Sequence, residues 1–281
     1  MNYRPKRLTF AIACVLAVTY AFIAGCANPE LPTDPTEVLD PPASSDPEPD
    51  PVPDPPAEPD PPIIAYSTVL IDFDSAVPGI IGEAFAASGF GVSPGPGQLD
   101  ADAWSILGFS DGDLVFGQEA SSGDWARGVS VGGVSTGGLY AFIVEPDNHA
   151  LGVQPTATDF APGSIILKTA VPADSITQLQ LDHRIWTLND KDRSTVWSTW
   201  YSLDGTTWIE LTGMAHTTPI LADADAQWSG AYYTAVVSLK DSTLSAGDPF
   251  YLRWDVIDGE GTGSRDESAI DDISVTFAYE E

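Results

Sequence analysis

From residue 63 onwards, short apolar runs rich in Val, Ile, Thr and aromatic residues alternate with clusters of Gly, Asp, Asn and Ser. Runs of this kind, bounded by turn residues, predict β-strands. No window of eleven or more residues holds a sustained apolar period of 3.6, so helices are not expected. The expected strands cover residues 68–73, 103–108, 113–116, 139–144, 164–169, 176–188, 195–203, 207–211, 232–239, 250–256 and 270–277.

Two of these segments alternate with period two. Over 250–256 the apolar residues fall at even positions, and Arg253 and Asp255 lie between them. Over 179–187 His183 shares the apolar face, and Trp186 lies on the opposite one. Each such strand has one apolar face and one more polar face. About ten strands of this kind predict an all-β fold, a two-sheet antiparallel jelly-roll β-sandwich.

The first 26 residues have the pattern of a targeting segment. A cationic start is followed by an apolar run from Leu8 to Ala24, which is shorter than the about 20 apolar residues of a membrane span. The run ends in Ile-Ala-Gly-Cys, which resembles the bacterial lipobox. This resemblance implies that Cys26 is lipidated and becomes the first residue of an exported lipoprotein. An ordinary signal peptide or a single membrane anchor is the alternative.

Residues 27–62 predict an extended tether. They hold 14 of the 24 prolines and ten acidic residues, with no Lys or Arg. Repeated Asp-Pro and Glu-Pro units exclude a helix, and polyproline II at about 3.1 Å per residue gives a reach on the order of 100 Å. The expected organisation is therefore a signal peptide over 1–26, a tether over 27–62 and one β-sandwich domain over 63–281.

The formal net charge of −30 makes the chain a poor partner for nucleic acid or anionic lipid headgroups. Of the two cysteines, Cys14 lies in the segment expected to be removed and Cys26 is the lipidation site. No disulfide is therefore expected in the domain, whose stability must come from its core. By analogy with lipoproteins of bacteria with two membranes, Ala27 after the cysteine favours the outer membrane or cell surface; the orientation stays open.

Several segments of residues 66–281 resemble a secreted bacterial β-sandwich module of unknown function. They are Gly97–Trp104, Gly108–Gly112, Asp124–Gly128, Ser135–Phe142, Ala150–Pro155, Gly263–Glu267 and Ala269–Val275. The turn over 201–208 and the final Ile-Asp-Asp-Ile-Ser-Val strand are also similar to MAM-like and carbohydrate-binding jelly rolls. The resemblance implies a fold and an extracellular place, and no settled activity.

The same resemblance implies a structural calcium site. In similar jelly rolls, acidic residues of the first and last strands share one Ca²⁺, which takes six to eight oxygen ligands. The matching residues here are Asp72, Asp74, Asp271 and Asp272. Successive strand residues face opposite ways, so only one of Asp271 and Asp272 is expected to be a ligand. The alternative is that all four are solvated edge or loop carboxylates.

Four of the eight tryptophans, Trp186, Trp197, Trp200 and Trp208, fall on neighbouring expected strands. Alternation places Trp197 and Trp200 on opposite faces, so at least one of them should leave the core. An exposed indole can stack on the apolar C–H face of a sugar ring. These four residues are the candidate ligand-binding set, against the alternative that they fill the core.

No constellation supports catalysis. The Gly133–Gly137 segment matches Gly-x-Ser-x-Gly, which requires a strand-to-helix elbow that the pattern does not predict. The chain is therefore expected to be a lipid-anchored, non-catalytic surface module that binds extracellular polysaccharide or a surface protein and is stabilised by calcium. A secreted polysaccharide hydrolase or lyase, or a purely structural envelope protein, are the alternatives.

Overall fold

The computed structural model describes residues 61–77, 80–81 and 84–281. The predicted signal peptide, with Cys26, and nearly all of the predicted tether lie outside the described residues. Within the described residues, no helix is long and apolar enough to cross a membrane.

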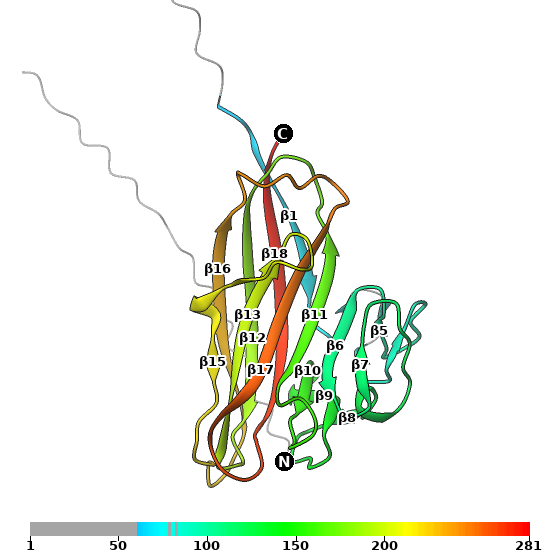
Figure 1. Ribbon diagram of the computed structural model, residues 1–281, viewed down its shortest axis with the longest axis vertical. Helices are drawn as coiled ribbons and strands as arrows, with labels where there is room; N and C mark the ends of the chain where they lie inside the picture. The colour runs from blue at the N-terminus through cyan, green and yellow to red at the C-terminus, as the bar shows by residue number, and fades with distance from the viewer. Residues whose placement is uncertain (1–60, 78–79, 82–83) are drawn as a thin grey trace, which may run out of the picture. The chain divides into compact units, whose positions relative to one another are not determined.

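The strands form two seven-stranded sheets that face each other (Figure 1). The first, which we call the β18 sheet, has the order β16-β12-β18-β10-β9-β8, and β1 pairs with the remaining length of β18. Its strands are β1 (Ile64–Ile71), β8 (Val129–Ser130), β9 (Gly138–Glu145), β10 (Asn148–Gln154), β12 (Ile176–Leu188), β16 (Trp228–Ser238) and β18 (Glu267–Glu280).

The second sheet, which we call the β17 sheet, has the order β14-β13-β17-β11-β6-β7, and β15 also pairs with β13. Its strands are β6 (Trp104–Phe109), β7 (Gly112–Leu114), β11 (Gly163–Ala170), β13 (Arg193–Ser202), β14 (Ile209–Glu210), β15 (His216–Thr217) and β17 (Pro249–Gly261). The smaller elements are β2 (Ala76–Val77), β3 (Ile80–Ile81), β4 (Phe90–Gly91), β5 (Leu99–Asp100) and the 3₁₀ turns η1 (Gly123–Trp125) and η2 (Thr212–Met214).

The long strands from β11 onwards alternate between the sheets, as the strands of a jelly roll do. All pairings within the two large sheets are antiparallel except β8 with β9. The predicted fold class is therefore confirmed. Every expected segment overlaps a strand, and the range 176–188 coincides with β12.

The core lies between the two sheets and is made by alternate residues of their strands. Each large apolar side chain removed from water contributes about 1.5–3 kcal/mol, which has to offset the entropy of ordering the chain. The fully buried members include Leu181, Ile185, Val275 and Phe277 from the β18 sheet and Leu167, Trp197, Leu252 and Trp254 from the β17 sheet.

Strand β10 was missed because its sequence, with Asn148, His149 and Gly152, lacks the usual apolar run. The structure explains the glycine. A Cβ at residue 152 would come within 2.1 Å of a ring carbon of Phe142, so only glycine lets this ring lie across the strand. Tertiary packing, rather than local propensity, places β10 in the sheet.

The turn over 201–208 begins at the end of β13 and contains the pair Asp204-Gly205. Gly205 has a φ of 73°, and Asp204 Oδ1 accepts hydrogen bonds from the backbone N–H groups of Thr206 (2.7 Å) and Thr207 (2.6 Å). These bonds fix the turn that leads into Trp208.

Strand β18 and the residue before it carry three carboxyl groups with no exposed surface, Asp266, Glu267 and Asp271. Burial, and then the charge of Asp272, raise the pKa of Asp271 to about 7. Burial raises the pKa of Glu267 to about 7 and that of Asp266 to about 6. Because burial disfavours the ionised form, these groups bind protons more tightly in the folded chain than in the unfolded one.

This arrangement predicts a pH dependence of stability that Asp271→Asn should weaken. The unfolded pKa is about 4 and the folded pKa about 7, so the stabilising contribution of Asp271 is complete below pH 4 and is lost as the pH rises through 7. The free energy of unfolding, measured with denaturant from pH 5 to 8, should therefore fall less steeply in Asp271→Asn, by up to about 1.4 kcal/mol per pH unit below pH 7.

Only the difference in slope between the unmodified chain and Asp271→Asn tests the assignment, because other groups also titrate between pH 5 and 8. Burial lowers the pKa of His183 to about 3, and this histidine destabilises the fold as the pH falls below 6.5 in both chains. Equal slopes in the two chains would contradict the assignment to Asp271.

Candidate functional site

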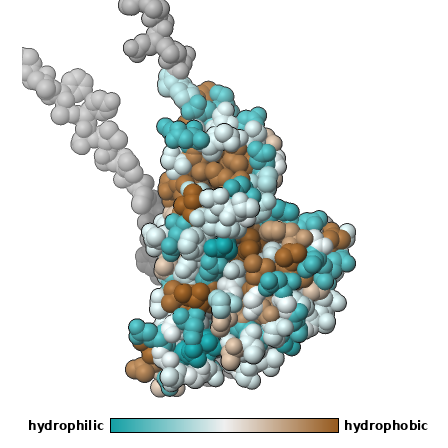
Figure 2. Space-filling model, in the orientation of Figure 1, coloured by the Kyte–Doolittle hydropathy of each residue, from teal (hydrophilic) through white to brown (hydrophobic). Residues whose placement is uncertain are grey.

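The outer face of the β17 sheet carries a row of large side chains. Strand alternation buries Trp197, Leu252 and Trp254 in the core, and it therefore turns Trp200, Tyr251, Arg253 and Lys168 outward. All four outward side chains are half-buried, which leaves part of each accessible to a ligand. Figure 2 shows hydrophobic patches separated by hydrophilic side chains on the face of the molecule turned to the viewer.

These side chains form a continuous series of ring and cation contacts, which we call the aromatic strip. The Arg253 guanidinium lies 5.2 Å from the ring centre of Trp200 and 4.5 Å from that of Trp208. The rings of Trp208 and Tyr251 are 6.4 Å apart at 72°. The series continues through Phe116, whose ring lies 6.1 Å from Tyr251 and 4.8 Å from Lys168 Nζ.

Neighbouring groups hold the strip in place. Arg253 pairs with Asp255 at 3.0 Å, and Ser164 Oγ donates to the same carboxylate at 2.6 Å. The Gly205 turn lies against Tyr251, where an added Cβ would come within 3.0 Å of the ring. The rings are therefore ordered before any ligand arrives, which lowers the entropic cost of binding.

A shallow hollow of about 440 Å³ lies beside the strip and shares Tyr251 and Lys168 with it. Asp100 and Asp102 also line the hollow, together with Thr169. Flat rings beside carboxylates, an ammonium group and a hydroxyl can stack on the C–H faces of a sugar and hydrogen-bond its hydroxyl groups.

The structure divides the four predicted ligand-binding tryptophans into two pairs. Trp200 and Trp208 belong to the strip, and Trp197 and Trp200 point to opposite faces as alternation predicted.

For Trp186 and Trp197 the expectation is corrected, since each ring is only 1% exposed and out of reach of a ligand. Trp197 donates through Nε1 to Ser268 Oγ at 2.9 Å across the sandwich. Trp186 lies on the outer face of the β18 sheet, where the Arg184 guanidinium covers its ring at 3.5 Å.

Four members of the strip were missing from the predicted set. The period-two pattern of 250–256 places Tyr251 on the same side as Arg253, so these two could have been found. Lys168 follows from the alternation of β11 in the same way. Phe116 lies after β7 in a turn, where no periodicity indicates the direction of a side chain.

The four carboxylates predicted to bind calcium lie where β1 and β10 meet along one edge of β18. Asp74 Oδ1 accepts hydrogen bonds from the backbone N–H and from Nδ1 of His149, at 2.7 and 3.1 Å. Burial raises the pKa of Asp272, and the nearby carboxylates of Asp72 and Asp74 raise it further. The structure therefore brings the two pairs of residues into electrostatic contact.

The chemistry of this junction suits calcium, but its geometry does not form a closed site. The buried Oδ1 of Asn148 has no hydrogen-bond partner and adds one oxygen of the kind that Ca²⁺ prefers. Asp72 Oδ1, however, accepts hydrogen bonds from the N–H groups of Asp74 and Ser75. Across 61–77, 80–81 and 84–281, no three His, Cys, Asp or Glu side chains converge to hold a metal ion. Calcium therefore stays a prediction.

The Gly-x-Ser-x-Gly match lies in the loop between β8 and β9, so Ser135 is followed by a strand rather than by a helix. This is not the sharp strand-to-helix turn that exposes a catalytic serine. The motif therefore gives no support to hydrolase chemistry.

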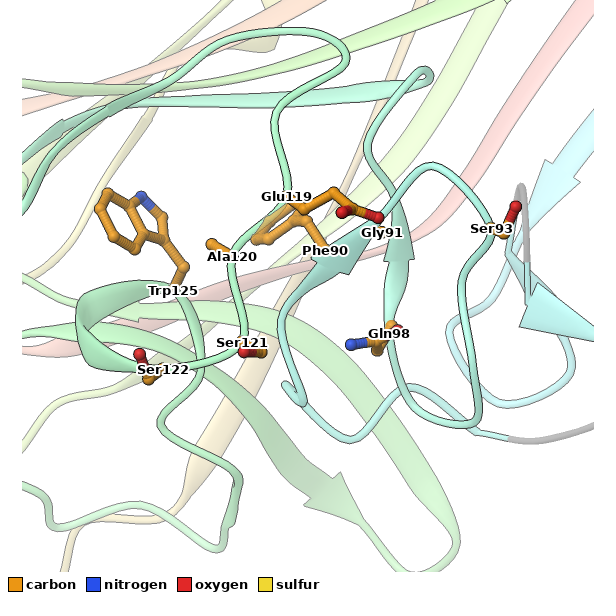
Figure 3. Close-up of a pocket in the computed structure, with 9 residues that line it drawn as sticks. All are labelled: Phe90, Gly91, Ser93, Gln98, Glu119, Ala120, Ser121, Ser122 and Trp125. Atoms are coloured by element: carbon orange, nitrogen blue, oxygen red, sulfur yellow. The ribbon is translucent and has the colours of Figure 1, made fainter.

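A second hollow, of about 520 Å³, lies between Phe90, Glu119 and Trp125 (Figure 3). Its polar side chains bind the surrounding loop. Gln98 accepts from the N–H of Gly95 and donates to the carbonyl of Ser88, and Glu119 accepts from the N–H of Val92. These bonds account for Gln98 and Glu119 as structural residues. Among the described residues that line it, the hollow lacks the continuous series of rings and cations found in the strip, so the strip is the better candidate.

No family model matches the chain, and no curated protein matches its sequence. Solved structures do match it. They include the K3 cleaved adhesin domain of Lys-gingipain from Porphyromonas gingivalis W83 (13% identity, 48% of this chain, 78% of that chain, TM-score 0.31). A xylan-binding module, CBM15, matches at 8% identity over 63% of this chain and 92% of its own, with a TM-score of 0.31. The module CBM27-1 of Caldicellulosiruptor saccharolyticus, solved with mannohexaose, matches at 9% identity over 50% and 82%, with a TM-score of 0.30. At these values the similarity concerns the β-sandwich alone.

Proposed function

We propose that this chain is a non-catalytic module that binds extracellular polysaccharide through the aromatic strip. The observation that carries the proposal is the unbroken series of rings and cations from Trp200 to Lys168 on the outer face of the β17 sheet. A solvent-facing row of rings is costly to keep unless it contacts a ligand, and sugars present apolar C–H faces that match it.

Different residues of the strip contact different parts of the sugar. Trp208 and Tyr251 supply the surfaces on which pyranose rings stack, while Arg253 and Lys168 supply hydrogen-bond donors between and beside them. Asp100 and Asp102, in the hollow beside Tyr251, supply acceptors for sugar hydroxyl groups. An open strip of this kind binds along a chain and leaves the sugar bonds intact.

Removal of either stacking ring should weaken binding. Trp208→Ala and Tyr251→Ala should each lower the affinity for a soluble polysaccharide by about tenfold or more, since buried Trp and Tyr anchors carry much of the energy of an interface. The measurement is calorimetric titration of the purified full-length chain with xylan, mannan, galactan and soluble cellulose oligomers.

The matched control is Tyr232→Ala, which removes a ring that is 69% exposed on the outer face of the other sheet. This variant should bind as the unmodified chain does. The proposal fails if the strip variants and Tyr232→Ala behave alike, or if sugar chains are cleaved during the titration.

We further propose that the module is held at the outer membrane or cell surface by lipid on Cys26. The proposal rests on the apolar run and the Ile-Ala-Gly-Cys motif of the sequence. In a bacterial host fed with a labelled fatty acid, the unmodified chain should carry the label and Cys26→Ala should carry none. The same substitution should move the protein from the membrane fraction to the soluble one; label retained in Cys26→Ala would contradict lipidation at this residue.

We also propose that calcium stabilises the junction between β1, β10 and β18. Added Ca²⁺ should raise the midpoint of thermal unfolding of the full-length chain, and a chelator should reverse the rise. Asp272→Asn should abolish the response, and it preserves the backbone because Asn tolerates the φ of 50° found at this position. Asp225→Asn, the same charge change in an exposed loop, is the control. An equal response in all three chains would point to non-specific screening instead.

A further inference from the structure

Four loops at one end of the sandwich, drawn lowest in Figure 1, surround a separate pocket of about 280 Å³. They are the connections from β8 to β9, β10 to β11, β12 to β13 and β17 to β18. The volume lies just below the usual range of about 300–1,000 Å³ for ligand pockets, and it suits one small ring rather than a length of polymer.

The charged side chains that line this pocket are all cationic. They are Lys191, Arg193 and Arg265, which are three of the eight Lys and Arg residues in 61–281 of a chain with a net charge of −30. Carboxylates pair with them without lining the pocket: Lys191 Nζ lies 2.6 Å from Asp190, and both arginines bind Asp258. Two further carboxyl groups lie close to Lys191: Asp266, whose Oδ1 accepts the backbone N–H of Lys191 at 3.0 Å, and Glu267, whose charge also acts on Lys191. The charged side chains that face the pocket are therefore cationic, and the carboxylates behind them offset part of that charge.

The arginines are held in fixed positions. Arg265 donates to the carbonyl of Thr156 at 2.8 Å, and Arg193 donates to the carbonyl of Gly263 at 3.3 Å. The Nε of Arg193 is buried and has no hydrogen-bond partner. Such a group is costly to leave unpaired, and an anionic ligand would reduce that cost.

A second unpaired group in the pocket is an acceptor. Gln154 is only 3% exposed, and its Nε2 donates to the carbonyls of Pro155 (2.9 Å) and Arg265 (3.2 Å). Because both partners are acceptors, the amide orientation is fixed and the remaining atom is Oε1. This oxygen is buried in the lining without a donor. A ligand hydroxyl group that reached Gln154 would supply the missing donor, and a carboxylate would suit the cations beside it.

We propose that this loop pocket binds a uronic acid, with its carboxylate on Lys191 and Arg193 and a hydroxyl group donated to Gln154. One six-membered ring that carries a carboxylate and hydroxyl groups meets the charge, the acceptor and the volume together. The pocket shares no residue with the aromatic strip, so this inference does not depend on polysaccharide binding there.

The test is a titration of the full-length chain with sodium D-glucuronate, followed by calorimetry or ligand-observed NMR, beside D-glucose and sodium acetate. Glucuronate should bind, while glucose lacks the charge and acetate lacks the hydroxyl groups. Lys191→Gln and Arg193→Gln should each weaken glucuronate binding by about tenfold or more, as expected for loss of a charged hydrogen bond. Lys240→Gln removes the same charge from an exposed position outside the pocket and should have no effect.

Several results would overturn the proposal: no glucuronate binding, equal binding of glucose, equal binding of acetate, or an equal loss in Lys240→Gln. Trp208→Ala separates the two sites. If this variant loses polysaccharide but keeps glucuronate, both proposals stand. If the unmodified chain binds glucuronate and no polysaccharide, only the strip proposal fails.

Discussion

The alternation of side chains along a β-strand is the constraint from which the candidate site follows. Burying Leu252 and Trp254 between the sheets requires Tyr251 and Arg253 to face outward, because successive residues of β17 point to opposite sides. The same rule on β13 buries Trp197 and exposes Trp200. The core residues and the strip residues therefore lie on opposite faces of the same strands. A shift of one residue in register would turn the strip residues inward and the core residues outward.

Strand β18 joins the parts of its sheet. It pairs with β12 on one side and with β1 and β10 in succession on the other, so three segments distant in sequence depend on it. Its buried carboxyl groups, Glu267 and Asp271, lie where a fold built only for stability would place apolar residues. With no cysteine in the described residues, the ladder on β18 and the core between the sheets connect the ends of the domain.

The sequence was sufficient for the fold class because the alternation in segments such as 250–256 depends on local pattern alone. The sequence was insufficient wherever contacts between distant segments determine whether a side chain is exposed or paired. Trp186 stands on an outward-facing position, as predicted, but Arg184 covers its ring, and a cover of this kind cannot be read from spacing. Phe116 reaches the strip from a turn, and the amide orientation of Gln154 is set by two loop carbonyls that accept from its Nε2.

The pairing of β1 with β18 also determines how the domain would respond to force. Ile64 lies beside Glu280 in the ladder, so tension from the preceding segment enters along the axis of β1. Where the opposing force acts at the other end of β18, the antiparallel ladder from Ile64 to Ile71 is loaded in shear and its hydrogen bonds resist together; a force at Glu280, which lies beside Ile64, would instead open them one after another. The loop pocket lies at the other end of β18, beyond Glu267, so a ligand bound there would pull on the ladder from the end opposite Ile64.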